Sequence, residues 1–267
     1  MLLSGKIHNE GADIAWYKEG QGPFLLLIPG GNGDSRLYTS LSTELASRYT
    51  VIRCDRRANA SSTGDTQAEL NMAQQARDVA AVVREVTGEK AFVFGSSAGA
   101  NIALALTQNH PQWVRGLVAH EPPVSDMLPD ATPWRMFFDA VYQTSLKSGS
   151  AEAMKLFASS FVGFDKNMPA PADQNGSHER FLAHEFNVIN RFVPDISVLR
   201  QSGVPMVTGV GRASGDAFYA QTARELARQL PCPCVDFIGN HTGYALSPGV
   251  FADELDNALQ SLSHADT

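Results

Sequence analysis

The sequence is poor in several features that mark particular classes of protein. It has three cysteines in 267 residues, 18% charged residues and a net charge of −7. Three cysteines cannot build a disulfide framework, and Cys232–Cys234 has neither zinc-site nor redox-motif spacing. We therefore expect reduced structural thiols and a cytoplasmic protein.

Long basic or apolar stretches are also missing. Because no block of lysines and arginines occurs, a nucleic-acid partner is not expected. No apolar run approaches the length of a membrane span, and residues 1–6 lack the regions of a signal peptide, so no membrane association is expected. Hydrophobic residues make up 43% of the chain, which is enough for one large domain with an insertion.

Apolar runs alternate with segments of helical periodicity over most of the chain. Such alternation predicts a mostly parallel sheet with helices on both faces, and the first two runs predict a hairpin. The strands are expected at 6–8, 14–17, 24–28, 51–54, 91–94, 114–119, 204–209 and 235–238. The helices are expected at about 36–48, 68–86, 100–107, 217–229 and 250–262.

Residues 125–200 interrupt this rhythm. They carry helical patterns near 134–147, 151–161 and 178–193, with an irregular connector at 169–171. The last of these helices would place Phe181, Glu185, Val188, Ile189 and Phe192 on one mostly apolar face. We predict a helical cap at 125–200, inserted after the sixth strand into a core formed by 1–124 and 201–267.

Residues 95–99, Gly-Ser-Ser-Ala-Gly, lie at the junction between a strand-like and a helical run. A Gly-x-Ser-x-Gly pattern in this setting is a nucleophile elbow, in which a tight turn needs small neighbours and exposes the serine. Ser97 is the predicted nucleophile. A serine hydroxyl needs a positioned base to take its proton.

His241 is the predicted base, because it follows the last strand in a loop that can reach the elbow. The other histidines fit less well: His8 and His264 are close to the termini, His110 precedes a proline, and His178 and His184 fall in the cap.

Two carboxylates compete to orient His241. Glu121 directly follows the strand beside the elbow strand, and Pro122 and Pro123 stiffen the backbone after it. Asp216 lies after the next strand, several residues beyond its end, and fits the N-cap of the 217–229 helix. Glu121 is preferred, with Asp216 as the alternative.

Acyl transfer also needs N–H donors for the developing oxyanion. The loop at 29–33, Pro-Gly-Gly-Asn-Gly, follows the third strand, and we assign the donors to Gly31 and Ala98. This loop lacks the spacing of a phosphate-binding loop. The segment 55–57, Asp-Arg-Arg, is expected to be structural.

Together, the 29–33 loop, the 95–99 elbow and Asn240-His241 resemble those of α/β-hydrolase-fold serine hydrolases with a helical cap. The segment 120–123, His-Glu-Pro-Pro, is similar to that of fungal zearalenone lactonases, whose acid follows this strand. Gly30 departs from those lactonases, which carry an acid in its place.

The resemblance implies hydrolysis of an ester or lactone through an acyl-enzyme, with no metal and no organic cofactor. Aromatic residues in the cap favour a medium-sized or bulky hydrophobic substrate. An elbow serine argues against epoxide hydrolases and haloalkane dehalogenases, which place an aspartate there. Carbon–carbon bond hydrolysis, perhydrolysis and a non-catalytic receptor remain open, and the sequence predicts no oligomeric state.

Overall fold

Eight strands form one sheet in the computed structural model, which describes residues 1–165 and 176–263. Their order across the sheet is β1-β2-β4-β3-β5-β6-β7-β8. The first two strands form an antiparallel hairpin, β2 pairs antiparallel with β4, and the other neighbours run parallel. The bounds are β1 Leu3–Asn9, β2 Ala12–Gly20, β3 Phe24–Ile28, β4 Thr50–Cys54, β5 Ala91–Ser96, β6 Val114–His120, β7 Met206–Gly211 and β8 Cys234–Phe237. The expected mostly parallel sheet is confirmed.

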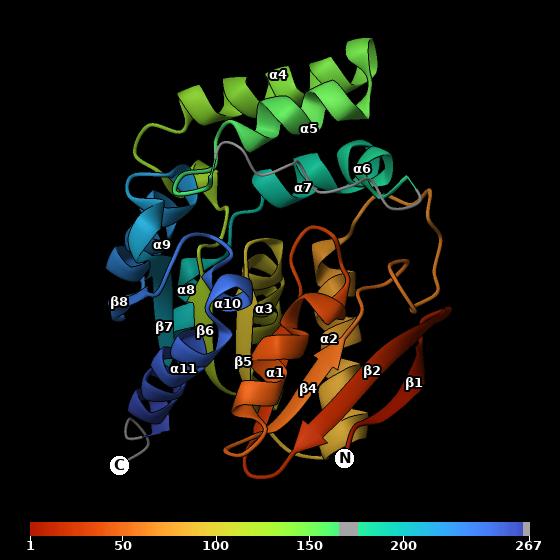
Figure 1. Cartoon of the computed structure of the whole chain (residues 1–267), viewed down its shortest axis with the longest axis vertical. Coiled ribbons are helices and arrows are strands. Elements are labelled where there is room, and N and C mark those ends of the chain that lie inside the picture. Colours follow the sequence, from red (N-terminus) through yellow and green to blue (C-terminus); the bar gives the residue numbers. More distant parts are fainter. Residues whose placement is uncertain (166–175, 264–267) are drawn as a thin grey trace.

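Helices cover both faces of this sheet (Figure 1). The run in β3 shows why its residues are all apolar: Leu26 and Ile28 pack on one face, and Leu25 and Leu27 on the other. The first face is covered by α2 (Met72–Thr87) and α3 (Ala98–Asn109), and the second by α1 (Thr39–Leu45) and α11 (Pro248–Ser263). A strand buried on both faces needs a continuous apolar run.

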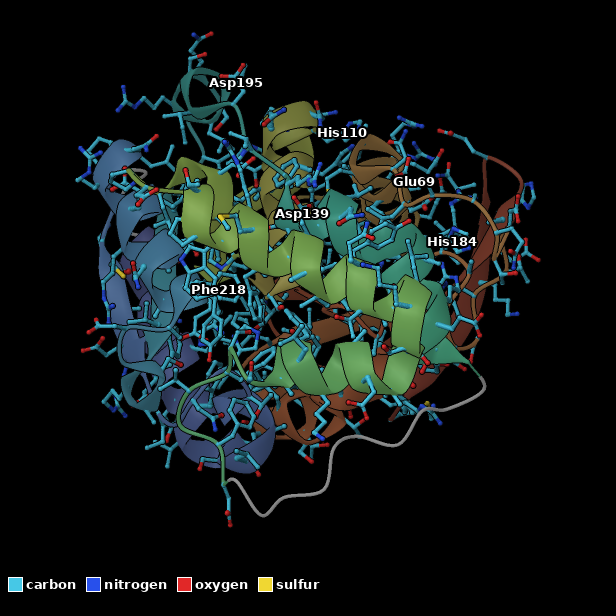
Figure 2. All side chains as sticks on the ribbon, turned by 90° about the horizontal axis from the view of Figure 1, so that it is seen from above. Glu69, His110, Asp139, His184, Asp195 and Phe218 are labelled. Atoms are coloured by element: carbon cyan, nitrogen blue, oxygen red, sulfur yellow. The ribbon has the colours of Figure 1, made fainter. Side chains whose placement is uncertain are left out.

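The helices between β6 and β7 form a separate layer. Figure 1 shows α4 (Thr132–Ser148) and α5 (Ser150–Ala158) in green across one end of the molecule, above α6 (Ser177–Arg180) and α7 (Phe186–Asn190). Figure 2 looks down on α4 and α5, which lie side by side. The next helix, α8 (Ile196–Gln201), instead buries Leu199 in the same core cluster as α3. Helices are therefore inserted after the sixth strand, as expected.

Several helix boundaries differ from the expected ones. The helix expected at 68–86 begins at Met72, because the side chain of Asn71 caps it by accepting a hydrogen bond from Gln74 N–H. The helix expected at 36–48 is a 3-10 turn followed by α1. Short helices α8 and α10 (Gly243–Leu246) were not predicted, while α9 (Phe218–Gln229) was. The expected connector at 169–171 lies outside the described residues.

The helix expected at 178–193 is broken into three parts. Between α6 and α7, residues Phe181–Glu185 form a π-helical turn, η4. A regular periodicity of 3.6 residues does not predict this turn, because a π turn has more residues than a turn of α-helix. Glu185 and Ile189 are buried, whereas Phe181 is half-buried.

Among the described helices, none is both long enough and apolar enough to cross a membrane.

Candidate active site

The turn between β5 and α3 forces Ser97 into an unusual conformation. Its backbone φ is 58° and its ψ is −131°, a combination that non-glycine residues rarely adopt. A Cβ on Gly95 would lie 2.2 Å from Gly99 O, and one on Gly99 would lie 2.1 Å from Ile28 O. The flanking positions must therefore be glycine. Ser97 is half-buried although every other residue from 91 to 100 is buried.

The carboxyl ends of β5 and β6 lie side by side. Ser96 is in register with His120, and their Oγ and Nδ1 atoms are 2.9 Å apart. The backbone N–H of Ser97 donates to His120 O at 3.0 Å. The elbow and the residue after β6, Glu121, therefore occupy the same edge of the sheet.

Glu121 is fully buried and accepts two hydrogen bonds. His241 Nδ1 lies 2.7 Å from Glu121 Oε2, and Gly211 N–H donates to Oε1 at 2.8 Å. Burial alone would raise the pKa of this carboxyl, but the hydrogen bond from His241, with smaller effects from His120 and Gly211, lowers the pKa to about 2. Glu121 is therefore a carboxylate at neutral pH, and it holds His241 through this hydrogen bond.

Backbone geometry at Glu121 helps to set this contact. Its φ is 47°, in the left-handed region, and its N–H donates to Gly209 O of β7 at 2.9 Å. The chain thus turns sharply after β6 while still bonded to the sheet. Strained backbone of this kind is maintained only where the surrounding structure fixes it.

Asp216, the alternative acid, points away from this edge. Its side chain is 99% exposed, and its nearest cationic partner is Arg224, at 3.8 Å. The expectation that Asp216 caps the next helix is wrong. Helix α9 begins at Phe218, so the N-cap position falls on Ala217, and no side chain caps it.

The glycine loop after β3 lies against the elbow. Gly33 N–H donates to Gly30 O at 3.1 Å, which closes a tight turn. A Cβ on Gly30 would lie 3.4 Å from Ser97 Cβ. The described part of the chain offers no acceptor to the backbone N–H of Gly31 or to that of Ala98, the first residue of α3. Two free N–H donors therefore flank the serine.

Aromatic rings from the inserted segment and from α9 lie near this edge. Tyr219 and Phe161 lie 4.3 and 5.3 Å from the His241 ring, measured between centroids. The Phe181 ring lies so close to Gly31 that a Cβ there would be 2.9 Å from it. Trp134 instead packs on Phe218, which Figure 2 labels beside α4. Some of the cap aromatics thus serve packing, and others face the site.

Three other histidines do not fit the role of the base. His8 pairs with Asp13 near the surface, and His264 lies outside the described residues. His120 is completely buried, and burial lowers its pKa to about 4. It is therefore a neutral core residue beneath the site, packed edge-on against Phe251.

Arg56, in the segment expected to be structural, and Glu185 form a buried ion pair beside the glycine loop. Sequence reasoning did not predict this pairing. The position of Arg56 just after β4 was the one available signal, because that strand ends at the same edge. The flanking residues are structural as expected: Asp55 accepts from Ser35 N–H, and Arg57 pairs with Asp78.

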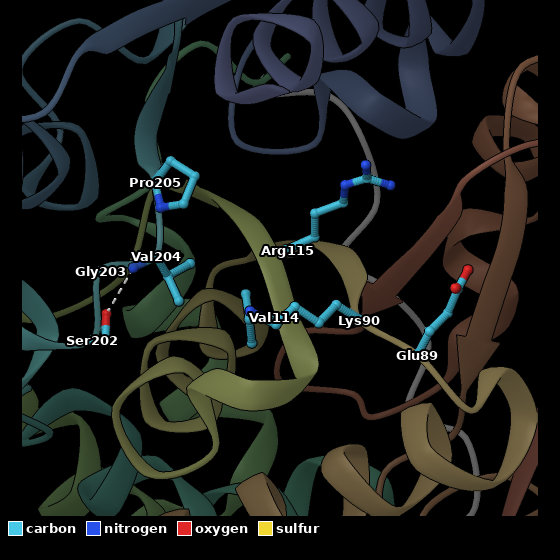
Figure 3. A pocket seen from close by; sticks show the side chains of 8 residues that line it. All are labelled: Glu89, Lys90, Val114, Arg115, Ser202, Gly203, Val204 and Pro205. Carbon is cyan, nitrogen blue, oxygen red and sulfur yellow. Dashed lines mark hydrogen bonds between the residues drawn. The ribbon is translucent and has the colours of Figure 1, made fainter. Parts of the chain in front are cut away.

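A pocket of about 370 Å³ lies at the opposite end of the sheet (Figure 3). Its lining includes Lys90, Val114 and Pro205, which stand at the amino ends of β5, β6 and β7. It is therefore distant from Ser97 and not part of the candidate site. Within residues 1–165 and 176–263, no cluster of three or more His, Cys, Asp or Glu side chains is arranged to hold a metal ion.

Comparison with known proteins agrees with this architecture. A family model for the alpha/beta hydrolase fold matches residues 23–190. An uncharacterized hydrolase, YraK of Bacillus subtilis (strain 168), is 30% identical over 97% of both chains. The chain belongs to the alpha/beta hydrolase family, and it is a hydrolase of that fold.

More distant similarities cover other members. The zearalenone hydrolase of Bionectria ochroleuca is 29% identical over 116 residues, 41% of this chain and 44% of that protein. Among solved structures, a thermophilic esterase from Thermogutta terrifontis superimposes with a TM-score of 0.77 at 19% identity, covering 97% of this chain and 99% of that one. At this identity, the likeness to the esterase shows the fold alone.

Proposed function

We propose that the protein is a serine hydrolase that cleaves a carboxylic ester or lactone through an acyl-enzyme. The observation that carries the proposal is the buried His241–Glu121 hydrogen bond at the strand edge that also bears the Ser97 elbow. A carboxylate on Nδ1 fixes the histidine tautomer whose Nε2 can accept a proton from a serine hydroxyl.

Each residue then has one role. His241 takes the proton of Ser97 as the Oγ atom attacks the substrate carbonyl carbon. The N–H groups of Gly31 and Ala98 bind the oxygen that becomes negative, and Glu121 stabilises the imidazolium that forms. When the tetrahedral intermediate collapses, the carbon–oxygen bond to the alkoxide breaks and His241 protonates the leaving oxygen.

The second half of the reaction repeats these steps with water. His241 removes a proton from a water molecule, whose oxygen attacks the acyl carbon. Collapse of the second intermediate returns the proton to Ser97 Oγ and releases the acid. The proposed mechanism uses no metal and no cofactor.

We further propose that residues 125–200 act as the cap that selects the substrate, over a core of residues 1–124 and 201–267. Phe161, Phe181 and Tyr219 favour a hydrophobic acyl or alcohol group beside the site. The partial similarity to zearalenone hydrolases supports including lactones among the substrates.

The three free cysteines favour the cytoplasm as the site of action.

A substrate panel with a matched variant tests this function. Purified protein should hydrolyse some p-nitrophenyl esters or aryl-fused lactones, and a fluorophosphonate probe should label Ser97. Ser97→Ala should abolish both activities, while Ser125→Ala, at a buried serine that donates to Asn190 O, should keep the labelling.

Other outcomes would assign the protein differently. Turnover of a dienoic diketone without ester turnover would identify a carbon–carbon bond hydrolase. Peroxide-dependent halogenation without ester turnover would identify a perhydrolase. An unlabelled wild-type serine together with tight retention of a ligand would identify a receptor. Each of these results would refute ester hydrolysis.

A further inference from the structure

Arg56 lies just after β4 and points into the protein, beneath the glycine loop. Its side chain is only 1% exposed. Nε donates to Gly30 O at 3.0 Å, and Nη2 donates to Gly31 O at 2.8 Å. Its own backbone N–H donates to Gly33 O at 2.9 Å. One residue therefore holds three carbonyl groups of the loop.

These contacts fix the direction in which a proposed oxyanion donor points. Gly30 C=O and Gly31 N–H belong to the same peptide unit, which is planar and trans, so the two groups point in opposite directions. When Arg56 holds the carbonyl on the inner side of the loop, the N–H of Gly31 is directed away from Arg56. A Cβ on Gly30 would lie 3.9 Å from Ser97 Oγ, so this peptide unit adjoins the nucleophile.

Glu185 supplies the charge that a buried guanidinium requires. Its Oε2 lies 2.6 Å from Arg56 Nη2, and its side chain is also 1% exposed. A buried charge without a partner is costly, so Arg56 depends on this carboxylate. Glu185 is the last residue of η4, a turn of the inserted helices, 129 residues from Arg56 in sequence.

This turn and the residue before it make two further contacts with this region. Arg180, immediately before η4, pairs with Glu185 Oε1 at 2.9 Å and donates to Asn59 Oδ1 at 2.7 Å. Phe181, its first residue, places its ring against Gly31. The π-helical turn is thus bonded to the loop from below through Arg56 and packed on it from above through Phe181.

We propose that Arg56 and Glu185 are positioning residues for the oxyanion hole, coupling the orientation of Gly31 N–H to the docking of η4. This inference rests on the proposed function, in which Gly31 is an oxyanion donor. Neither residue touches the substrate in this role, because both act through the backbone of the loop.

Arg56→Lys tests the proposal without removing the positive charge. A lysine ammonium lacks the planar fork and cannot donate to Gly30 O, Gly31 O and Glu185 in the arginine geometry. Arg57→Lys is the matched control, because Arg57 is a neighbouring, mostly buried arginine that pairs with Asp78 and does not contact the loop. Glu185→Gln tests the partner while preserving its shape.

The expected result is a loss in kcat with little change in KM. For Arg56→Lys, kcat on an ester that the wild type hydrolyses should fall by ~100-fold, the lower range for loss of one oxyanion donor. Affinity for a phenylboronic acid, which forms a tetrahedral adduct on the serine, should fall by a similar factor. Glu185→Gln should lower both quantities by a smaller factor, and Arg57→Lys should leave both unchanged.

Melting temperatures separate this role from a merely structural one. Equal losses of kcat in Arg56→Lys and Arg57→Lys, tracking their melting temperatures, would overturn the proposal, as would wild-type kcat and boronate affinity in Arg56→Lys. If Arg56→Lys does not fold, an unaltered kcat in Glu185→Gln overturns it. Any of these results would overturn the role of Arg56 and Glu185 while the wild type still shows Ser97-dependent ester turnover. Absence of ester turnover in the wild type would instead refute the proposed function, and this inference with it.

Discussion

The hydrogen bonds at Glu121 allow a sharp test of its proposed role as the acid of the triad. Its two carboxylate oxygens each accept from a nitrogen: His241 Nδ1 at 2.7 Å and Gly211 N–H at 2.8 Å. A glutamine in its place has one oxygen and one NH₂ group. In Glu121→Gln, the NH₂ group of the glutamine must therefore face either His241 Nδ1 or Gly211 N–H.

Either orientation of the glutamine damages the site. If its oxygen stays with Gly211 N–H, its NH₂ group faces His241 Nδ1 and forces the proton of the imidazole onto Nε2, the atom that must act as base. If its oxygen turns to His241, the NH₂ group meets Gly211 N–H inside a fully buried site. The strong backbone N–H donor of Gly211 favours the first arrangement.

We expect a loss in kcat of ~10⁴-fold for Glu121→Gln, the size found when a triad carboxylate becomes an amide and the wrong tautomer results. This corresponds to about 5.5 kcal/mol of transition-state stabilisation. Asp216→Asn is the matched control, because that side chain is 99% exposed, and its kcat should remain at the wild-type value. Steady-state kinetics on a p-nitrophenyl ester and the rate of fluorophosphonate labelling measure both variants.

Retention of more than a tenth of wild-type kcat in a folded Glu121→Gln variant would refute this reasoning. So would a larger loss in Asp216→Asn than in Glu121→Gln, since it would transfer the role to the exposed carboxylate.

Three further predictions concern stability. Burial lowers the pKa of His120 from 6.5 to about 4, so at this residue the unfolded chain binds more protons than the folded protein between these pH values. His120 alone should therefore lower the free energy of unfolding by about 3 kcal/mol from pH 6.5 to 4. A pH dependence of the unfolding free energy that is unchanged in His120→Asn would contradict this. Ala60 is exposed and has a φ of 47°, a left-handed conformation that is strained for a residue with a Cβ. Ala60→Gly should therefore stabilise the protein by about 0.5 kcal/mol in urea denaturation. Destabilisation by this substitution would argue against strain at Ala60. Gly99→Ala should lower the free energy of unfolding by about 3 kcal/mol, because the added Cβ would lie 2.1 Å from the backbone oxygen of Ile28. Gly249→Ala is the control and should not destabilise the protein, because its Cβ has space. Equal effects of the two substitutions would show that overlap is not the cause.

Local patterns were sufficient to predict most of the framework. The apolar run in β3 predicts a strand buried on both faces, because each side chain meets a packed helix layer. The small residues around Ser97 predict the elbow, since a Cβ at Gly95 or Gly99 would overlap backbone atoms. Both features depend on neighbours within a few residues or on a face that the pattern itself specifies.

Features that depend on distant residues were not available from local patterns. Periodicity predicted one continuous helix where η4 interrupts it, and Glu185 looked like an exception on an apolar face. Its burial makes sense only with Arg56, which contributes the opposite charge from the end of β4. No spacing rule connects two residues that lie 129 positions apart.

The sequence by itself determined the order of strands and helices, the strained turn at Ser97 and two candidate carboxylates for His241. Only the tertiary structure shows which of those carboxylates contacts His241, because Glu121 meets it across 120 residues while the Asp216 side chain is exposed to solvent. It also decided that Arg56 holds the glycine loop. The physical reason is that hydrogen bonds and buried ion pairs depend on positions in space, which are fixed only when the sheet and the inserted helices pack together.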